Sequence, residues 1–422
     1  MHSKVKNAVI VSLKQDFSEI KELTDSLGYN TIETFYQNRK TPDVNTFVGS
    51  GKLQEIEDFI EKSEENVDLV IIDYELKPSQ WFNLEKKLDV NVFDRIRLIL
   101  TIFEERAERK EAKLQVKLAH LNYERPFVRE LIHRARAGEH PGLMAGGEYQ
   151  VDDYYEKIKK QMKKIKNELK NISDERELRR RHRYKSGFYL VSLAGYTNAG
   201  KSSLLNLLSD EQVRVEGRLF STLSTTTRKI KDKKIPILLT DTVGFIQDLP
   251  AYVIDAFHST LEELEAADVV LLIVDISENI NIIENKLKVS LNELTDLRVE
   301  SEVIIVFNKS DLVSNDEISE KISYFQENNL IKNNKKVIVS SKNQHNIDVL
   351  LKTIYESLPD LISFKIKLPL VEQTHPLVSW IYDKAHVQDI SYNDNVILSV
   401  ECNIEIYKKI VSKSNDVNGV VF

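Results

Sequence analysis

Cysteine is almost absent from this sequence, since Cys402 is the only one among 422 residues. A single thiol forms neither a disulfide within the chain nor a paired-cysteine zinc site, so we expect a reducing compartment, the cytoplasm. Long hydrophobic runs are also lacking. Stretches such as residues 269–274 are far shorter than the roughly 18–20 residues that a membrane span needs, so no transmembrane helix is predicted.

The charge balance shows no excess of basic residues. Lys and Arg number 59 against 66 Asp and Glu, which gives a net charge of −7 and excludes a uniformly basic surface. The 41% hydrophobic and 30% charged residues are ordinary for a globular protein. At roughly 150 residues per domain, the length predicts about three domains. The apolar run at residues 8–13 is too short for a signal peptide, so we expect a first β-strand there.

Four regions of different pattern predict an α/β multidomain protein. Residues 1–93 alternate β-like and helical runs, which is typical of a small α/β domain with a parallel sheet. Residues 94–185 are charged and poor in glycine, as expected of an antiparallel, coiled-coil-like helical hairpin. Residues 186–360 follow the pattern of a doubly wound, nucleotide-binding α/β domain. Residues 361–422 predict a small α+β domain of order βαββαβ.

Both arms of the expected hairpin carry an apolar seam. In the first arm the seam residues recur every seven positions, at Leu100, Ala107, Leu114 and Leu121. In the second arm they alternate spacings of four and three, at Ile158, Met162, Ile165, Leu169 and Ile172. Residues 151–185 have a local net charge of +6, which fits either a footprint for nucleic-acid phosphates or an ordinary solvated helix face.

A phosphate-binding loop is indicated within residues 186–360. The pattern G-x-x-x-x-G-K-[ST] is matched after an apolar strand and before a helix, by Gly195, Tyr196, Thr197, Asn198, Ala199, Gly200, Lys201 and Ser202. In such a loop backbone amides face phosphate oxygens, the lysine reaches the β- and γ-phosphates, and the hydroxyl ligates Mg²⁺. We therefore expect Lys201 and Ser202 to fill these two roles.

Two further motifs end apolar strands of the same region. The first is D-x-x-G, formed by Asp241, Thr242, Val243 and Gly244, in which the Asp can hold Mg²⁺ through water and the Gly N–H can meet a γ-phosphate. The second is N-K-x-D, formed by Asn308, Lys309, Ser310 and Asp311. A carboxylate at Asp311 can accept from two guanine donors that adenine lacks, which would reject adenine. A further base-contacting loop is predicted at Ser340, Ser341 and Lys342.

These four motifs, in this order, resemble those of the translation-factor class of GTPases. The phosphate loop, the sequence of residues 219–223, and the D-x-x-G motif followed by Phe245 and Ile246 resemble the HflX family of ribosome-associated GTPases more closely. Residues 48–52, 79–85 and 94–116 resemble the N-terminal part of that family. The resemblance covers about residues 40–358.

The resemblance implies a nucleotide site that takes GTP or GDP with Mg²⁺. It adds the loop of Phe220, Ser221, Thr222 and Leu223, in which Thr222 would close on Mg²⁺ and the γ-phosphate, while Thr226 is a competing candidate. The implied metal ligands are then Ser202 and Thr222, and the implied catalytic residues are Lys201, Thr222 and Gly244.

The resemblance also implies a partner, the large ribosomal subunit with its RNA and proteins. Phe245 stands where Ras-like GTPases keep a water-orienting Gln, so slow intrinsic hydrolysis completed by the ribosome is expected. Splitting or rescue of stalled ribosomes is the implied role. An RNA-binding assembly or modification GTPase, similar to Era-like or Obg-like proteins, is the alternative. The hairpin tip departs from the family pattern, since only Gly147, Glu148 and Gln150 of residues 144–152 match it.

Overall fold

The computed structural model describes residues 6–136, 147–185, 187–209, 226–230, 236–242, 244–245, 250, 252–253, 263–359 and 361–422. These residues form two compact units, which are described separately here. The first unit contains the described chain up to Asn171 together with Pro250, Tyr252 and Val253, and the second contains the remainder. Within the described ranges, no helix is long and apolar enough to cross a membrane.

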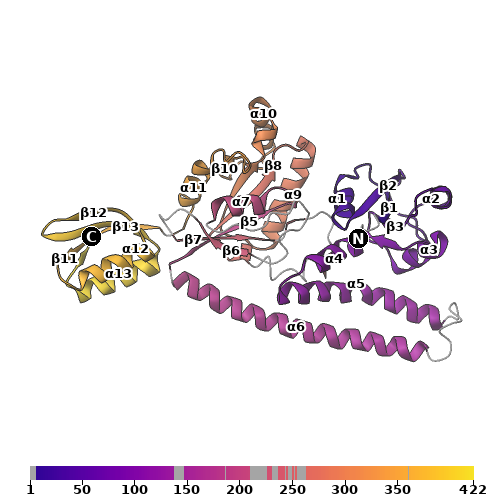
Figure 1. The fold of residues 1–422 in the computed structure, drawn as a ribbon, viewed down its shortest axis with the longest axis horizontal. Helices are drawn as coiled ribbons and strands as arrows, with labels where there is room; N and C mark the ends of the chain where they lie inside the picture. Colours follow the sequence, from indigo (N-terminus) through magenta and orange to yellow (C-terminus); the bar gives the residue numbers. More distant parts are fainter. Residues whose placement is uncertain are drawn as a thin grey trace. The chain divides into compact units, whose positions relative to one another are not determined.

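The N-terminal part of the first unit is an open parallel sheet with the strand order β2-β1-β3-β4 (Figure 1). Its elements are β1 (Lys6–Ser12), α1 (Ser18–Ser26), β2 (Tyr29–Tyr36), α2 (Ser50–Lys62), β3 (Leu69–Ile72), α3 (Pro78–Leu88) and β4 (Val92–Asp94). Residues 8–11 of β1 and all of β3 are continuous apolar runs and are buried, as expected where helices cover both faces of a parallel sheet. The predicted α/β fold of this region is confirmed.

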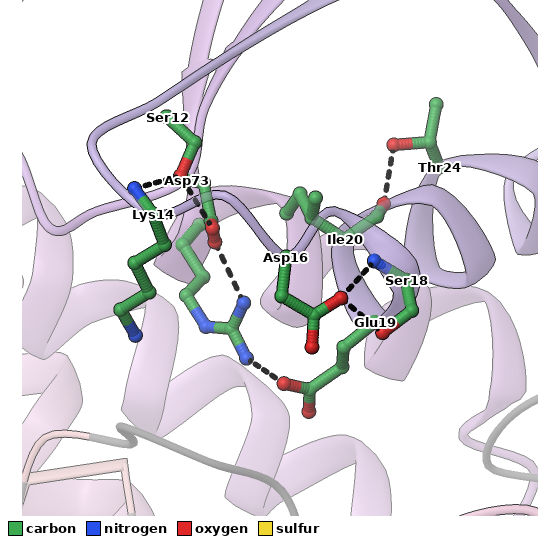
Figure 2. A network of polar contacts seen from close by, with 9 residues as sticks. Ser12, Lys14, Asp16, Ser18, Glu19, Ile20, Thr24 and Asp73 are labelled. Carbon is green, nitrogen blue, oxygen red and sulfur yellow. Dashed lines mark hydrogen bonds and ion pairs between the residues drawn. The ribbon is translucent and has the colours of Figure 1, made fainter. Parts of the chain in front are cut away.

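A polar network joins the carboxyl ends of three strands of this sheet (Figure 2). Ser12 Oγ donates to Asp73 at 3.1 Å, and the Arg95 guanidinium pairs with Asp73 at 2.8 Å and with Glu19 of α1 at 2.7 Å. Burial opposes the charge of Arg95, but the two carboxylates outweigh it and raise the pKa of the guanidinium. This network ties α1 to the sheet.

Three helices follow: α4 (Arg95–Arg106), α5 (Lys110–Arg136) and α6 (Gly147–Lys185). The expectation of one continuous first arm is wrong, because α4 ends at Arg106 and the extended backbone of Ala107 breaks the seven-residue repeat. Leu100 is fully buried on α4, which belongs with the N-terminal sheet. The seam that does form joins α5 to α6 through the buried side chains Leu118, Leu121, Val128, Ile158, Met162 and Ile165. Residues 144–146 of the tip lie outside the described residues.

The second unit contains a six-stranded sheet of order β10-β9-β8-β5-β7-β6, in which β6 alone is antiparallel to its neighbour. Its strands are β5 (Tyr189–Gly195), β6 (Thr226–Lys229), β7 (Ile237–Asp241), β8 (Val269–Asp275), β9 (Glu302–Asn308) and β10 (Lys336–Ile338). Its helices include α7 (Lys201–Leu208), α9 (Ile280–Asp296), α10 (Asn315–Glu327) and α11 (Ile347–Tyr355). The doubly wound α/β prediction is confirmed, and such a sheet places ligands at the carboxyl ends of its strands.

The C-terminal part of the second unit is a small antiparallel sheet of order β12-β13-β11-β14. Figure 1 shows its strands β11, β12 and β13 with the helices α12 and α13. The order of elements is β11 (Ile362–Pro369), α12 (Thr374–Lys384), β12 (His386–Tyr392), β13 (Asn395–Cys402), α13 (Ile404–Asp416) and β14 (Val420–Val421). Alternate residues of β13 are buried, so one face of the sheet packs against α12 and α13. The βαββαβ order expected for this region is observed.

Candidate nucleotide-binding site

The phosphate-loop motif connects β5 to α7 at the carboxyl edge of the six-stranded sheet. Gly195 has φ +132° and Gly200 has φ +98°, both in the left-handed region that glycine adopts without strain. A Cβ on Gly195 would collide with the carbonyl oxygen of Ile273, and one on Gly200 with the side-chain amide of Asn308. The two glycines therefore allow the phosphate loop to lie close to β8 and to the end of β9.

Lys201 is the first residue of α7 and is 7% exposed. Its Nζ donates to the carbonyl oxygens of Gly195 at 2.9 Å and Tyr196 at 2.7 Å. Burial lowers the pKa of Lys201 to about 8, although the nearby Asp241 carboxylate opposes this. The ammonium group is thus held by the loop itself and lies ready for an anion.

Ser202 and Asp241 provide oxygen atoms of the kind that Mg²⁺ prefers. Ser202 Oγ donates to the Asp241 carboxylate at 2.7 Å, and Asp241 is fully buried at the end of β7. Thr242, the next residue, donates to the Leu193 carbonyl at 2.6 Å and fixes the turn. One hydroxyl and one carboxylate fit a Mg²⁺ that takes its other ligands from phosphates and water. Among the described residues, no group of three or more His, Cys, Asp or Glu side chains could hold a metal alone.

Asn308 links the phosphate loop to the two base-contacting loops. Its Nδ2 donates to the Ala199 carbonyl at 3.0 Å. Its Oδ1 accepts from the Ser341 amide at 3.0 Å and from the Ser341 hydroxyl at 2.9 Å. Asn308 is 1% exposed, so its side chain mainly holds the loops together and offers little surface to a ligand.

Asp311 lies in a short 3₁₀ turn (Ser310–Leu312) after β9. The Ser340 hydroxyl donates to its carboxylate at 2.6 Å, and this bond, helped by Lys342 and Lys309, holds the pKa of Asp311 below its usual value. The carboxylate therefore stays ionised at neutral pH. A fixed anion of this kind can accept the paired N–H donors of guanine.

Asp275 belongs to this site but is not part of any of the sequence motifs. It ends β8 next to Asn308 of β9, and its carboxylate pairs with Lys309 Nζ at 2.6 Å. Lys309 has φ +62°, so this ion pair fixes a side chain that starts from an unusual backbone conformation. The sequence does contain a sign of this role, because Asp275 directly follows the apolar run of residues 269–274, where a strand of the sheet is expected to end.

Gly244 of the D-x-x-G motif and Phe245 after it lie against the phosphate loop. Gly244 approaches Thr197 and Lys201, and Phe245 is buried. Five of the expected residues fall outside the described ranges, namely Phe220, Ser221, Thr222, Leu223 and Val243. The competing candidate Thr226 begins β6 and pairs with Asp241 across the sheet. The choice between Thr222 and Thr226 therefore stays a prediction.

The Gly49-Ser50-Gly51-Lys52 sequence of the N-terminal sheet forms no second phosphate loop. Gly49 caps α2 and donates its N–H to Gln37 at 2.9 Å. Lys52 pairs with Glu55 one turn along the same helix at 2.6 Å. Residues 49–52 end like the G-K-[ST] part of a phosphate loop only superficially, and they form an ordinary helix start.

A phosphate loop after the central strand, a D-x-x-G turn beside it and an N-K-x-D loop after β9 define the class of the second unit: a P-loop GTPase. Three family models match the chain: "GTP-binding GTPase N-terminal" over residues 14–104, "GTP-binding GTPase Middle Region" over 106–183, and "50S ribosome-binding GTPase" over 190–309. Relatives named "GTPase HflX" match 72–90% of the chain at 40–46% identity, so the chain belongs to the HflX family of GTPases.

Curated relatives support this assignment over most of the chain. It is 40% identical over 386 residues to "GTPase HflX" of Methanocaldococcus jannaschii, covering 90% of this chain and 91% of the relative. It is 46% identical over 307 residues to "GTPase HflX" of Thermococcus kodakarensis, covering 72% and 69%. Among solved structures, "crystal structure of SsGBP and GDP complex" matches with a TM-score of 0.50 and 26% identity, covering 83% of this chain and 98% of that one.

Proposed function

We propose that this protein is a Mg²⁺-dependent switch that binds and hydrolyses GTP and acts on the ribosome. The observation that carries the proposal is the convergence of three strand-end loops through Asn308, which contacts Ala199 of the phosphate loop and Ser341 of the base loop. One side chain thus couples the phosphate end of the site to its base end. Such coupling suits a ligand that spans both, as a nucleotide does.

Each part of the site has a role in this proposal. Lys201 contacts the β- and γ-phosphates, while Ser202 and Asp241 hold Mg²⁺, Ser202 directly and Asp241 through water. Asp311 selects guanine, and the Gly244 N–H meets the γ-phosphate. Bound Mg²⁺ would neutralise part of the phosphate charge, and the protein would hold the nucleotide in position. GDP in the crystal structure of a similar protein supports the choice of nucleotide.

Intrinsic hydrolysis is expected to be slow. Phe245 follows Gly244 where a water-orienting side chain would be needed, and its phenyl ring is 7% exposed and neither donates nor accepts a hydrogen bond. We propose that the ribosome, through its large subunit, orders the loops around the γ-phosphate and raises the rate. The family model described as "50S ribosome-binding GTPase" supports this partner. Splitting or rescue of stalled ribosomes in the cytoplasm is the role we propose.

The lysines of α6 favour a second candidate, an RNA-binding factor in ribosome assembly or RNA modification. Seven lysines between residues 157 and 170 are exposed on this helix, at positions 157, 159, 160, 163, 164, 166 and 170. Among the described side chains, Lys157 pairs with Asp153 and Lys159 pairs with Glu156 on the same helix. A cationic helix face is suited to RNA phosphates. Accumulation of precursor subunits on depletion, without binding to mature ribosomes, would favour this candidate.

GTP turnover measured with and without purified ribosomes tests the leading proposal. Wild-type protein should hydrolyse GTP slowly alone and much faster with ribosomes, with ATP turned over poorly in both cases. Lys201→Ala should lower the stimulated rate by about a hundredfold or more, because it removes the cation beside the transferred phosphate. The exposed Lys352→Ala, on α11, is the control and should behave as wild type.

Turnover that is insensitive to ribosomes would contradict the ribosome-stimulated switch and leave a GTPase with another activator. Hydrolysis of ATP that survives Lys201→Ala would indicate a second nucleotide site in the N-terminal sheet.

A further inference from the structure

Phe245, directly after the D-x-x-G motif, is joined to the phosphate loop by two main-chain hydrogen bonds. The Phe245 N–H donates to the Gly195 carbonyl at 3.0 Å, and the Thr197 N–H donates to the Phe245 carbonyl at 3.3 Å. Tyr196, between these two loop residues, is therefore paired with Phe245 as in a parallel sheet. Phe245 and the phosphate loop are thus held together as a short extension of the sheet.

The side chains of the same pair also contact each other. The rings of Tyr196 and Phe245 meet edge to face, with centroids 6.4 Å apart and an interplanar angle of 71°. Tyr196 is 5% and Phe245 is 7% exposed. The Lys286 ammonium lies 5.4 Å from the centroid of the Tyr196 ring and pairs with Glu278, so Tyr196 is fixed from α9 as well.

This pairing places Gly244 against the cation of the site. A Cβ built on Gly244 would lie 2.9 Å from Lys201 Nζ and 2.9 Å from the Thr197 nitrogen. A γ-phosphate needs room between the P-loop lysine and the D-x-x-G amide, since it contacts both. A γ-phosphate between these two groups therefore requires Gly244 to move away from Lys201, whereas a diphosphate does not use this space.

We infer that Tyr196 is a positioning residue that, through Phe245, holds Gly244 close to Lys201 and the phosphate loop and thereby sets the preference between GDP and GTP. GTP binding has to break the Tyr196–Phe245 pairing, whereas GDP binding leaves it intact. The inference rests on the proposed function as a guanine-nucleotide switch. Tyr196 is then the residue of this switch that opposes the GTP-bound state.

The ring contact gives the size of the expected effect. An aromatic pair contributes enough beyond its buried area to change an equilibrium by about two- to tenfold. Removing either ring weakens the closed state and favours GTP by that factor. Removing both rings should give no more than removing one, because the same contact is lost in each case.

The test compares Tyr196→Ala, Tyr196→Phe, Phe245→Ala and the double alanine variant with wild type. The dissociation constants for GDP and for a non-hydrolysable GTP analogue are measured by titration in the presence of Mg²⁺. The ratio of GDP to analogue affinity should fall about two- to tenfold in both single alanine variants and no further in the double variant. Tyr196→Phe should keep the wild-type ratio, since it keeps the ring.

An unchanged ratio in both single alanine variants would overturn the inference. A parallel loss of affinity for both nucleotides would also overturn it, because Tyr196 would then support the phosphate loop alone. Should Tyr196→Ala fail to fold, as judged by circular dichroism, Phe245→Ala tests the same contact from its other side. Wild-type protein that binds neither guanine nucleotide would instead refute the proposed function.

Discussion

At the scale of single residues, the burial of Lys201 couples nucleotide binding to protons. Burial lowers the pKa of its ammonium to about 8, so a growing fraction of the side chain is neutral as the pH rises above 7. Nucleotide phosphates add negative charge beside Lys201 and raise its pKa again. The bound state therefore holds more protons than the free state, and affinity falls as the pH rises through 8.

Calorimetric titration with GDP in buffers of different ionisation enthalpy checks this prediction. Proton uptake on binding should increase as the pH is raised through 8, because the free side chain then loses its proton. The same titration at two ionic strengths serves as a control for general charge effects. Uptake that does not change with pH would show that Lys201 is fully charged before the nucleotide arrives.

At the scale of elements, the start of α4 depends on one buried carboxylate. Asp94 accepts from the Arg97 N–H at 2.7 Å, which caps the helix, and from the Leu76 N–H at 3.0 Å, which fastens the loop before α3. Asp94→Ala loses the cap and leaves a buried N–H without a partner, so the free energy of unfolding should fall by about 2–4 kcal/mol. Urea unfolding of the N-terminal sheet, followed by Trp81 fluorescence in a Trp380→Phe background, measures the loss.

The effect of Asp94→Ala should also depend on pH. Burial raises the pKa of Asp94 to about 6, above its ordinary value of 3.8. The wild-type carboxyl therefore contributes most stability when protonated, below about pH 4, and loses that contribution as the pH rises through 6. The difference from Asp94→Ala should thus be larger at pH 5 than at pH 8. Asp16→Ala, which removes an exposed acceptor of the Ser18 N–H just before α1, should cost only about 0.5–1 kcal/mol at either pH.

At the scale of the whole molecule, positive charge is concentrated on α6 although the chain carries a net −7. Replacing three exposed lysines of one helix face, Lys163, Lys166 and Lys170, with Gln should weaken binding to ribosomal subunits. The slope of log affinity against log salt should fall by up to about 3, because each lost phosphate contact removes a little under one unit. GTP turnover without ribosomes should not change.

A triple variant with the same charge change elsewhere provides the control. Lys332, Lys336 and Lys352 are exposed on the GTPase domain, and their replacement with Gln should leave the salt slope as in wild type. Equal effects of the two triple variants would indicate that net charge, rather than the α6 face, governs binding.

The sequence by itself determined the doubly wound domain, the phosphate loop and the base-contacting loops, because each motif is contiguous and follows an apolar run that has to be a buried strand. The tertiary structure decided what those motifs touch. The structure pairs Asp275 with Lys309 and Phe245 with Tyr196, residues that are far apart in the sequence or belong to different motifs. It also ends the first helix of the hairpin before Ala107, within a repeat that locally looks continuous. Periodicity records which residues are buried, but the partner against which each is buried depends on the whole packed chain.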